Sequence, residues 1–235
     1  LGERPIIEEM IGLLADLDFE RIIIVTGHLA HFYAGLSEVY GSLIETVHNP
    51  HYANSGSMYS LYCARNHVDS DFLLLESDLV FERRALTACR DLARDNVVLM
   101  SGRTNAGDEV YVETRGGLLV AMSKDRDELG TEVAGELVGI CKISLPLFQG
   151  MCEEAEAGFT TTLKVCYETD CLVAVASRHP IHCHLVEDLA WSEIDYEMHL
   201  HNAQENVYPE ILRRDGARRP PLKHRRRLKT GKLGG

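Results

Sequence analysis

Continuous apolar runs separated by helical patterns constrain the fold of this chain more than any other feature. Residues 21–27, 71–78 and 96–101 are runs rich in Ile, Leu and Val. Runs of this kind are typical of strands buried on both faces, as in sheets covered by helices. The segments between them, residues 28–40 and 57–66, have the pattern of helices. Strands that alternate with helices over short links predict an α/β fold built on an open, doubly wound sheet.

The other segments extend this pattern and add a hairpin. Residues 5–17 carry an apolar stripe at helical spacing, with Pro5 in the first turn. Residues 108–114 and 118–122 flank Arg115-Gly116-Gly117 and predict a small antiparallel hairpin inserted into the fold. The remaining expected elements are helices over 81–94, 145–157, 160–169 and 197–207 and strands over 43–47, 137–144 and 172–175.

Charge divides the chain into a body and a tail. Of its 24 Lys/Arg and 36 Asp/Glu residues, ten and one, respectively, lie in residues 213–235. The acidic body, residues 1–212, contains no linker and is expected to form one domain that does not bind nucleic acid. The tail is rich in like charge, Pro and Gly and is expected to be disordered. It is either a solvated terminus or a segment that docks on nucleic acid or an anionic membrane.

Composition favours a cytoplasmic protein without a membrane span. No apolar run reaches the roughly 20 residues that a transmembrane helix needs. The seven cysteines are scattered and include no C-x-x-C pair, which argues against a disulfide framework or a structural zinc site. The sequence does not determine the oligomeric state.

Two carboxylates stand where a parallel sheet binds its ligands. Asp78 follows the apolar run Leu73-Leu74-Leu75, at the expected carboxyl end of a strand, and Asp195 follows the only Trp, Trp191, before a predicted helix. Mg²⁺ takes one or two carboxylates together with phosphate oxygens and water. Each aspartate is equally consistent with a helix N-cap.

A series of segments, in order and at suitable spacing, carries a resemblance to a known family. The segments are Ile22-Ile23-Ile24-Val25-Thr26-Gly27, Asn49-Pro50-His51-Tyr52, Ser57-Met58-Tyr59-Ser60-Leu61, Phe72-Leu73-Leu74-Leu75-Glu76-Ser77-Asp78, Gly135-Glu136-Leu137-Val138-Gly139-Ile140 and Trp191-Ser192-Glu193-Ile194-Asp195. Together they resemble the CTP:phosphocholine cytidylyltransferase group of nucleotidyltransferases. Gly107-Asp108-Glu109-Val110 and Ser123-Lys124 are most similar to its 2-aminoethylphosphonate cytidylyltransferase branch.

The resemblance implies a Rossmann-like, doubly wound mixed sheet of the nucleotidyltransferase type. It also implies Mg²⁺-dependent transfer of CMP from CTP to 2-aminoethylphosphonate, phosphocholine or a similar small amine, with release of pyrophosphate. The residues carried over fall into three groups. Asp78 and Asp195 are the expected catalytic metal ligands; Ser57, Tyr59 and Ser60 are expected at the nucleotide; Asp108, Glu136 and Tyr167 are expected at the acceptor amine.

One part of the family pattern has no counterpart in the sequence. Members begin with a strand and a Gly-rich loop that cradles the triphosphate, whereas Gly2-Glu3-Arg4-Pro5 matches the segment just after that loop. Residues 1–212 are therefore expected to lack the first strand and the loop, which makes the activity of this chain uncertain. The alternatives are a sugar-1-phosphate nucleotidyltransferase and an inactive fragment of such an enzyme.

Overall fold

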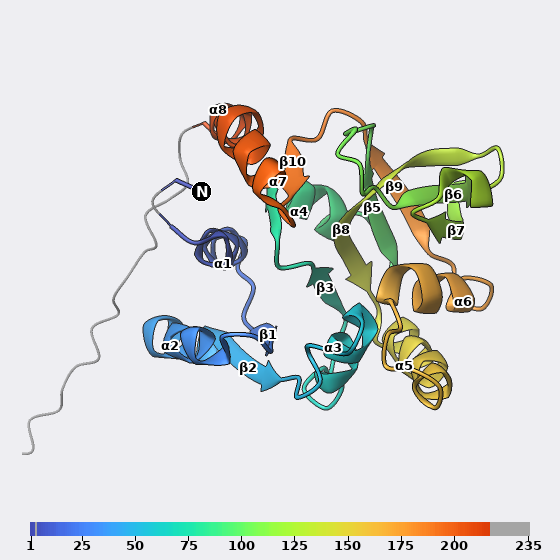
Figure 1. Ribbon diagram of the computed structural model, residues 1–235, viewed down its shortest axis with the longest axis horizontal. Coiled ribbons are helices and arrows are strands. Elements are labelled where there is room, and N and C mark those ends of the chain that lie inside the picture. The colour runs from blue at the N-terminus through green and yellow to red at the C-terminus, as the bar shows by residue number, and fades with distance from the viewer. Residues whose placement is uncertain (3, 217–235) are drawn as a thin grey trace, which may run out of the picture.

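The computed structural model describes residues 1–2 and 4–216, so most of the predicted basic tail lies outside the described residues. Helices and sheets alternate along most of this range (Figure 1). The helices are α1 (Ile6–Asp16), α2 (Ala30–Tyr40), α3 (Ser57–Cys63), α4 (Arg84–Arg90), α5 (Leu145–Phe159), α6 (Val173–Val175), α7 (Glu197–Asn202) and α8 (Tyr208–Arg214). Short 3-10 helices cover Gly41–Leu43 and Arg126–Glu128, and π-helical turns cover Tyr167–Leu172 and Ala203–Val207.

The described strands form three sheets. The strands are β1 (Ile22–Thr26), β2 (Ile44–His48), β3 (Phe72–Leu75), β4 (Leu79–Phe81), β5 (Val97–Ser101), β6 (Tyr111–Arg115), β7 (Leu118–Ser123), β8 (Val133–Ile143), β9 (His182–Val186) and β10 (Trp191–Glu193). β1 and β2 pair in parallel, and β4 and β10 pair antiparallel. The third sheet has the order β3-β8-β5-β9-β7-β6, and β6 also pairs with β8, so that the sheet curls back on itself.

The mixed α/β class is thus confirmed, but a single open sheet is not what the described residues form. The only parallel pairs among them are β1–β2 and β5–β9. The predicted hairpin is present as β6 and β7, although it is part of the curled sheet through β8 and β9 rather than a separate insertion.

Three local predictions were wrong. Residues 81–94 begin with the end of β4, because Phe81 pairs with Trp191 and only Arg84–Arg90 are helical. Residues 160–166 form no helix, and residues 172–175 belong to a helical turn instead of a strand. At Phe81, the pairing with Trp191 outweighs the local apolar pattern.

The core lies on the two faces of β5 and β8. Because successive side chains of a strand point to opposite faces, Val98 and Cys141 contact one buried cluster, whereas Val97 and Ile140 contact another. α5 covers the first face, and α1 and α4 cover the second. β5 is buried on both faces, as its continuous apolar run predicts.

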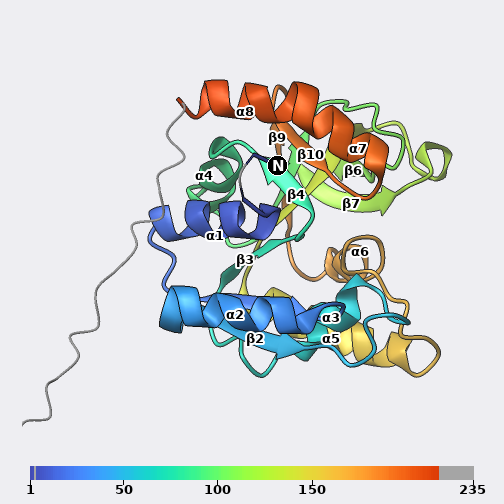
Figure 2. The ribbon, with the colours of Figure 1, turned by 60° about the vertical axis from the view of Figure 1, so that its left-hand side comes forward.

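The sheet of β1 and β2 is separate from the six-stranded sheet. β3 is the edge strand of the six-stranded sheet, and Figures 1 and 2 place it on the side of that sheet toward β1 and β2. Among the described residues, β1 pairs only with β2 and β3 only with β8. All four residues of β3 are only partly buried, although the sequence Phe-Leu-Leu-Leu is that of a core strand. One edge of each strand is therefore open.

No helix in the described part of the chain is long and apolar enough to cross a membrane. All seven cysteines are free thiols, as their spacing predicts.

Candidate functional site

The first carboxylates of the site follow β3. The backbone N–H of Glu76 donates to the carbonyl of Gly139 at 3.0 Å, which closes the β3–β8 pairing. Gly139 has a φ of +78°, and a Cβ there would lie 2.5 Å from the Glu76 carboxylate. Only glycine permits both this backbone conformation and this close approach. The next turn brings Asp78 to the start of β4.

The second set of carboxylates comes from β10. Leu79 pairs with Glu193, and the N–H of Ile194 donates to the carbonyl of Asp78 at 3.1 Å. This short antiparallel ladder places the segment around Asp195 beside the start of β4. Two segments more than 100 residues apart in the sequence thus deliver acidic side chains to one place.

Glu193 connects two groups of carboxylates. In each group, one oxygen from every member lies within 4.8 Å of the others; the groups are Glu76, Asp78 and Glu193, and Asp108, Glu193 and Asp195. The two predicted metal ligands, Asp78 and Asp195, belong to different groups and are related through Glu193. Asp195 is exposed, whereas the other members are partly buried.

Burial and mutual repulsion make this cluster hard to ionise. Burial raises the pKa of Glu76 to about 7, although a hydrogen bond from Tyr167 offsets part of this rise. Burial also raises the pKa of Glu193 to about 8, with added repulsion from Glu76, Asp78 and Asp195. The pKa of Asp78 is raised, first by burial and then by Asp195. The site therefore has a strong excess of carboxylate over cationic partners.

The donor set fits a hard divalent cation. Asp78 Oδ1 and Asp108 Oδ2 are buried oxygens that have no hydrogen-bond partner among the described residues. Buried polar atoms without partners are rare, and such an oxygen is suited to a cation. Carboxylates alone, with no cysteine among them, are the ligands of Mg²⁺ or a similar ion rather than of zinc.

A cavity of about 1520 Å³ extends from these carboxylates to the open edges of β1 and β3. Its polar end is lined by Glu76, Asp78, Glu193 and Lys124, and its apolar end by the β1 and β3 strands together with α1. This volume exceeds the roughly 300–1,000 Å³ of a typical small-molecule site. The lining includes residues of both strands that, within the described part of the chain, have an unpaired edge, β1 and β3.

Of the three residues predicted at the nucleotide, Ser57 and Ser60 line the cavity. Ser57 Oγ accepts from the N–H of Tyr167 at 3.0 Å and donates to Glu168, and Ser60 Oγ accepts from Asn49 at 3.0 Å. Tyr59 lies outside the cavity lining, because its ring packs edge-on against Phe159, 5.1 Å between centroids.

The three residues predicted at the acceptor amine all line the cavity. The buried Tyr167 donates its hydroxyl to Glu76 at 2.6 Å. Asp108 lies 3.7 Å from His199 Nδ1. Glu136 is already engaged, because its carboxylate accepts from both the backbone N–H and the hydroxyl of Thr104 at 2.8 Å.

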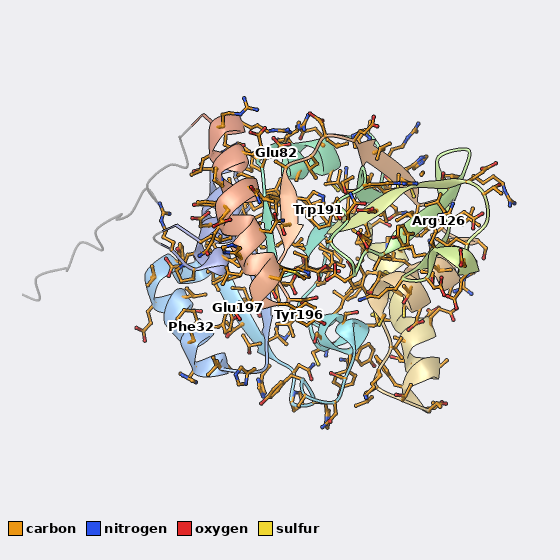
Figure 3. The ribbon with its side chains drawn as sticks, turned by 45° about the horizontal axis from the view of Figure 1, so that its top comes forward. Phe32, Glu82, Arg126, Trp191, Tyr196 and Glu197 are labelled. Carbon is orange, nitrogen blue, oxygen red and sulfur yellow. The ribbon has the colours of Figure 1, made fainter. Side chains whose placement is uncertain are left out.

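Glu76 and Glu193 are the site residues that the sequence analysis missed. Each stands two positions before a predicted ligand, Asp78 and Asp195 respectively. Residues two apart in an extended segment point to the same side. The i, i+2 spacing of the acidic side chains in Glu76-Ser77-Asp78 and Glu193-Ile194-Asp195 was the signal that could have identified them. Figure 3 shows Trp191 on β10 and, after Asp195 in the chain, Tyr196 and Glu197 at the start of α7.

Comparisons with known proteins found a sequence relative and several structures of similar fold. No protein-family model matches the chain. Over 131 residues, 54% of this chain, it is 31% identical to a CMP-5'-(3-aminopropyl)phosphonate synthase from Streptomyces rubellomurinus. The matched region is about a fifth (21%) of that relative's length.

Solved structures are similar over most of the chain. An inositol-1-phosphate CTP transferase from T. maritima has a TM-score of 0.72 at 16% identity, covering 88% of this chain and 83% of its own. The CTP:phosphocholine cytidylyltransferase from Streptococcus pneumoniae has a TM-score of 0.69 at 17% identity, covering 87% and 86%. The chain therefore shares the fold of these transferases, and over 131 residues its sequence is similar to that of the Streptomyces protein.

Proposed function

We propose that this chain forms the metal-binding part of a Mg²⁺-dependent cytidylyltransferase. The reaction transfers CMP from CTP to a phosphonate or phosphate oxygen of a small amine such as 2-aminoethylphosphonate or phosphocholine. The acceptor oxygen forms a bond to the α-phosphorus while the bond to the β-phosphate oxygen breaks, and pyrophosphate leaves. The observation that carries the proposal is the pair of carboxylate groups joined through Glu193. Asp78 and Glu193 line the polar end of the cavity, whereas Asp195 belongs to the second group and is not among the lining residues. The similarity to an aminopropylphosphonate synthase favours a phosphonate acceptor.

The carboxylates divide between two tasks. Asp78, Asp195 and Glu193 would hold Mg²⁺, which when bound neutralises charge on the phosphates at the reacting centre. Ser57 and Ser60, on the α3 side of the cavity, would contact the nucleotide through their hydroxyls. Tyr59 packs elsewhere and has no part in the proposal. The remaining acidic groups are then available to the acceptor.

The acceptor side suits a molecule with both an amine and an anionic group. Glu76 and Asp108 offer negative charge to an ammonium, and the Tyr167 hydroxyl orients the Glu76 carboxylate. An ammonium beside Glu76 would return its raised pKa toward the ordinary value, which stabilises the bound amine. Lys124, which also lines this end, can pair with the phosphonate.

We further propose that activity requires an additional strand, with a phosphate-binding loop, between β1 and β3. A strand in this place would lie about 4.8 Å from each neighbour and would pair both open edges. It would join the β1–β2 sheet to the six-stranded sheet and produce the Rossmann-like arrangement that the sequence resemblance implies. The apolar lining from Ile22, Ile24, Leu73 and Leu75 supports this placement. A loop following the strand would supply backbone N–H groups to the triphosphate.

Pyrophosphate release by the chain, assayed together with a segment that supplies the proposed strand and loop, tests the function. We expect turnover with CTP plus 2-aminoethylphosphonate or phosphocholine, and little with sugar phosphates. Preference for a sugar phosphate would instead identify a sugar-1-phosphate nucleotidyltransferase, and absence of turnover with every acceptor would mean an inactive relative.

The variant Asp78→Asn tests the metal assignment. Mutation of a residue that only orients a metal ligand lowers metal affinity or activity by ~10–100-fold. Loss of Asp78 as a direct ligand should therefore lower turnover by at least about 100-fold. It should also abolish Mn²⁺ binding by the present chain, measured from the electron paramagnetic resonance signal of free Mn²⁺. Asp69→Asn is the matched control, because Asp69 lines the same cavity before β3 but is 82% exposed. Wild-type activity in Asp78→Asn would refute the assignment.

A further inference from the structure

The β4–β10 ladder extends beyond its three paired residues at both ends. At the site end, the N–H of Ile194 donates to the carbonyl of Asp78 at 3.1 Å. At the far end, the N–H of Glu82 donates to the carbonyl of Ala190 at 2.9 Å. The register of this ladder determines where Glu193 and Asp195 lie relative to Asp78. Whatever holds the far end therefore influences the geometry of the carboxylate cluster.

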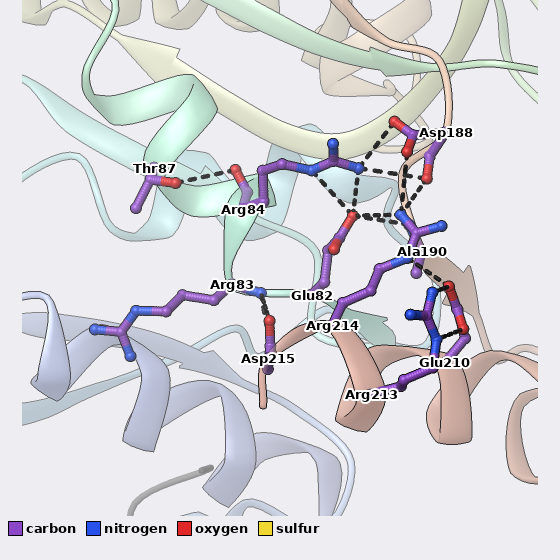
Figure 4. Close-up of polar contacts among 10 residues, drawn as sticks. All are labelled: Glu82, Arg83, Arg84, Thr87, Asp188, Ala190, Glu210, Arg213, Arg214 and Asp215. Carbon is purple, nitrogen blue, oxygen red and sulfur yellow. Dashed lines mark hydrogen bonds and ion pairs between the residues drawn. The ribbon is translucent and has the colours of Figure 1, made fainter. Parts of the chain in front are cut away.

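A buried carboxylate holds the far end (Figure 4). The Glu82 side chain is only 4% exposed. Its Oε1 accepts from the N–H of Ala190 at 3.2 Å, from Arg84 at 2.7 Å and from Arg214 at 3.1 Å. Figure 4 shows the two guanidinium groups converging on this one oxygen and on Asp188. A carboxylate buried to this extent is stable only when it is paired.

Arg214 connects this contact to the helical segment that follows the site. The segment runs from Glu197, two residues after Asp195, through a π-helical turn to Arg214. Ala203 and Ile211 of this segment pack in one buried cluster with Val80 and Ala190 of the ladder. Arg214 therefore fixes the far end of the helix to the far end of the ladder.

We propose that Arg214 is a positioning residue, which acts through Glu82 to hold the β4–β10 register and thereby the relative placement of Asp78, Glu193 and Asp195. This inference rests on the proposed metal-binding function. Without Arg214, the Glu82 carboxylate keeps only Arg84 as a charged partner and turns toward it. The N–H of Ala190 then loses the Glu82 carboxylate as its acceptor, and the strand that carries Glu193 is held less firmly.

Arg213 offers a matched control on the same helical turn. Its side chain is 71% exposed and pairs with Glu210, which Arg214 also contacts. Arg213→Gln removes a charge and a contact to Glu210 but leaves Glu82 and Asp188 paired. Arg214→Gln removes the same charge together with the contacts to Glu82 and Asp188. The difference between the two variants therefore reports the contacts that Arg214 makes with Glu82 and with Asp188.

The experiment measures Mn²⁺ affinity of the chain by electron paramagnetic resonance. We expect Arg214→Gln to bind Mn²⁺ about tenfold more weakly, at the lower end of the effect found for residues that orient metal ligands. Arg213→Gln should bind like the wild type, and Arg214→Lys, which keeps the charge, should recover part of the affinity. The single Trp, Trp191, pairs with Phe81 in the ladder, so its fluorescence emission should shift in Arg214→Gln but not in Arg213→Gln.

The outcomes separate this inference from the proposed function. Equal Mn²⁺ affinity in the folded Arg214→Gln and Arg213→Gln variants would overturn the positioning role, even if Arg214→Gln melted at a lower temperature, because the pair would then only stabilise the fold. Failure of the wild-type chain to bind Mn²⁺ would overturn the metal site itself, and this inference with it.

Discussion

At the scale of single residues, the site depends on five carboxylates whose side chains lie close together. Asp78 and Asp195 stand out in the sequence because each follows an apolar or aromatic segment at a point where the chain turns polar; their role as metal ligands stays a prediction. Glu76 and Glu193 share the spacing signal, two positions before each aspartate, but the ladder and the Gly139 contact were needed to show that their side chains are held at the site. Side-chain alternation gives the direction of a residue but not what lies opposite it.

The raised pKa of Glu76 predicts a stability that falls with pH. An unfolded glutamate ionises near pH 4.5, whereas burial keeps Glu76 protonated up to about pH 7 in the folded chain. Its contribution therefore opposes folding increasingly from pH 4.5 to 7 and then levels off. Without divalent cations, Glu76→Gln should stabilise the chain above pH 7, by at most about 3 kcal/mol, and have little effect near pH 4.5. Urea unfolding at several pH values measures this.

An exposed counterpart provides the control for this variant. The Tyr62 hydroxyl donates to Glu156 at 2.7 Å on the surface, as that of Tyr167 does to Glu76 inside the cavity. Glu156→Gln should change stability little at any pH. If both variants gave the same pH profile, burial of Glu76 would not be the cause.

At the scale of elements, long apolar runs were predictable and short segments were not. β5 is buried on both faces, as its sequence predicts, and α1 and α5 follow their apolar stripes. Residues 79–81 and 191–193, in contrast, become strands only because they pair with each other. Their pairing partner is more than 100 residues away, so no local pattern could reveal it.

The position of α3 depends on a close backbone contact at Gly56. A Cβ at Gly56 would lie 2.3 Å from the carbonyl oxygen of Val165, while the backbone φ of −86° suits any residue. Gly56→Ala should therefore destabilise the chain by about 1–3 kcal/mol through overpacking alone. It should also weaken nucleotide binding, because Ser57 would move away from Tyr167.

A glycine in open space serves as the comparison. Gly35 lies within α2, and a Cβ there meets nothing within 4 Å. Gly35→Ala should stabilise the chain, by up to about 1 kcal/mol. Urea unfolding of both variants is the measurement, and a stabilised Gly56→Ala would contradict the close contact.

At the scale of the whole molecule, the open edges of β1 and β3 predict uneven stability. β5 is paired on both sides, whereas β1 is paired on one side among the described residues. Backbone amides of β1 and β3 should therefore exchange with deuterium faster than those of β5 in the native state. A segment that adds the proposed strand between β1 and β3 should slow their exchange and leave β5 unchanged. Equal protection of all three strands in the present chain would mean that the edges are not open.

The α/β class followed from the alternation of strands and helices, but the separation into three sheets did not. Sequence patterns identify which residues prefer to be strands, yet the order of strands depends on which edges meet. β8 illustrates this, because its C-terminal part is flanked by β3 and β5, whereas its N-terminal part pairs with β5 and β6. No periodicity in residues 133–143 encodes three partners.

The position of Glu193 in both carboxylate groups has a consequence for how the site would fill. A carboxylate that donates its charge to one cation has less to offer a second, so two ions in the neighbouring groups would compete for the same side chain. Occupancy would then proceed in steps, a tight first ion followed by a weaker second. The second ion would become favourable once the phosphates of the nucleotide added oxygens of their own. The order in which cations bind would thus depend on Glu193, the carboxylate that both groups share.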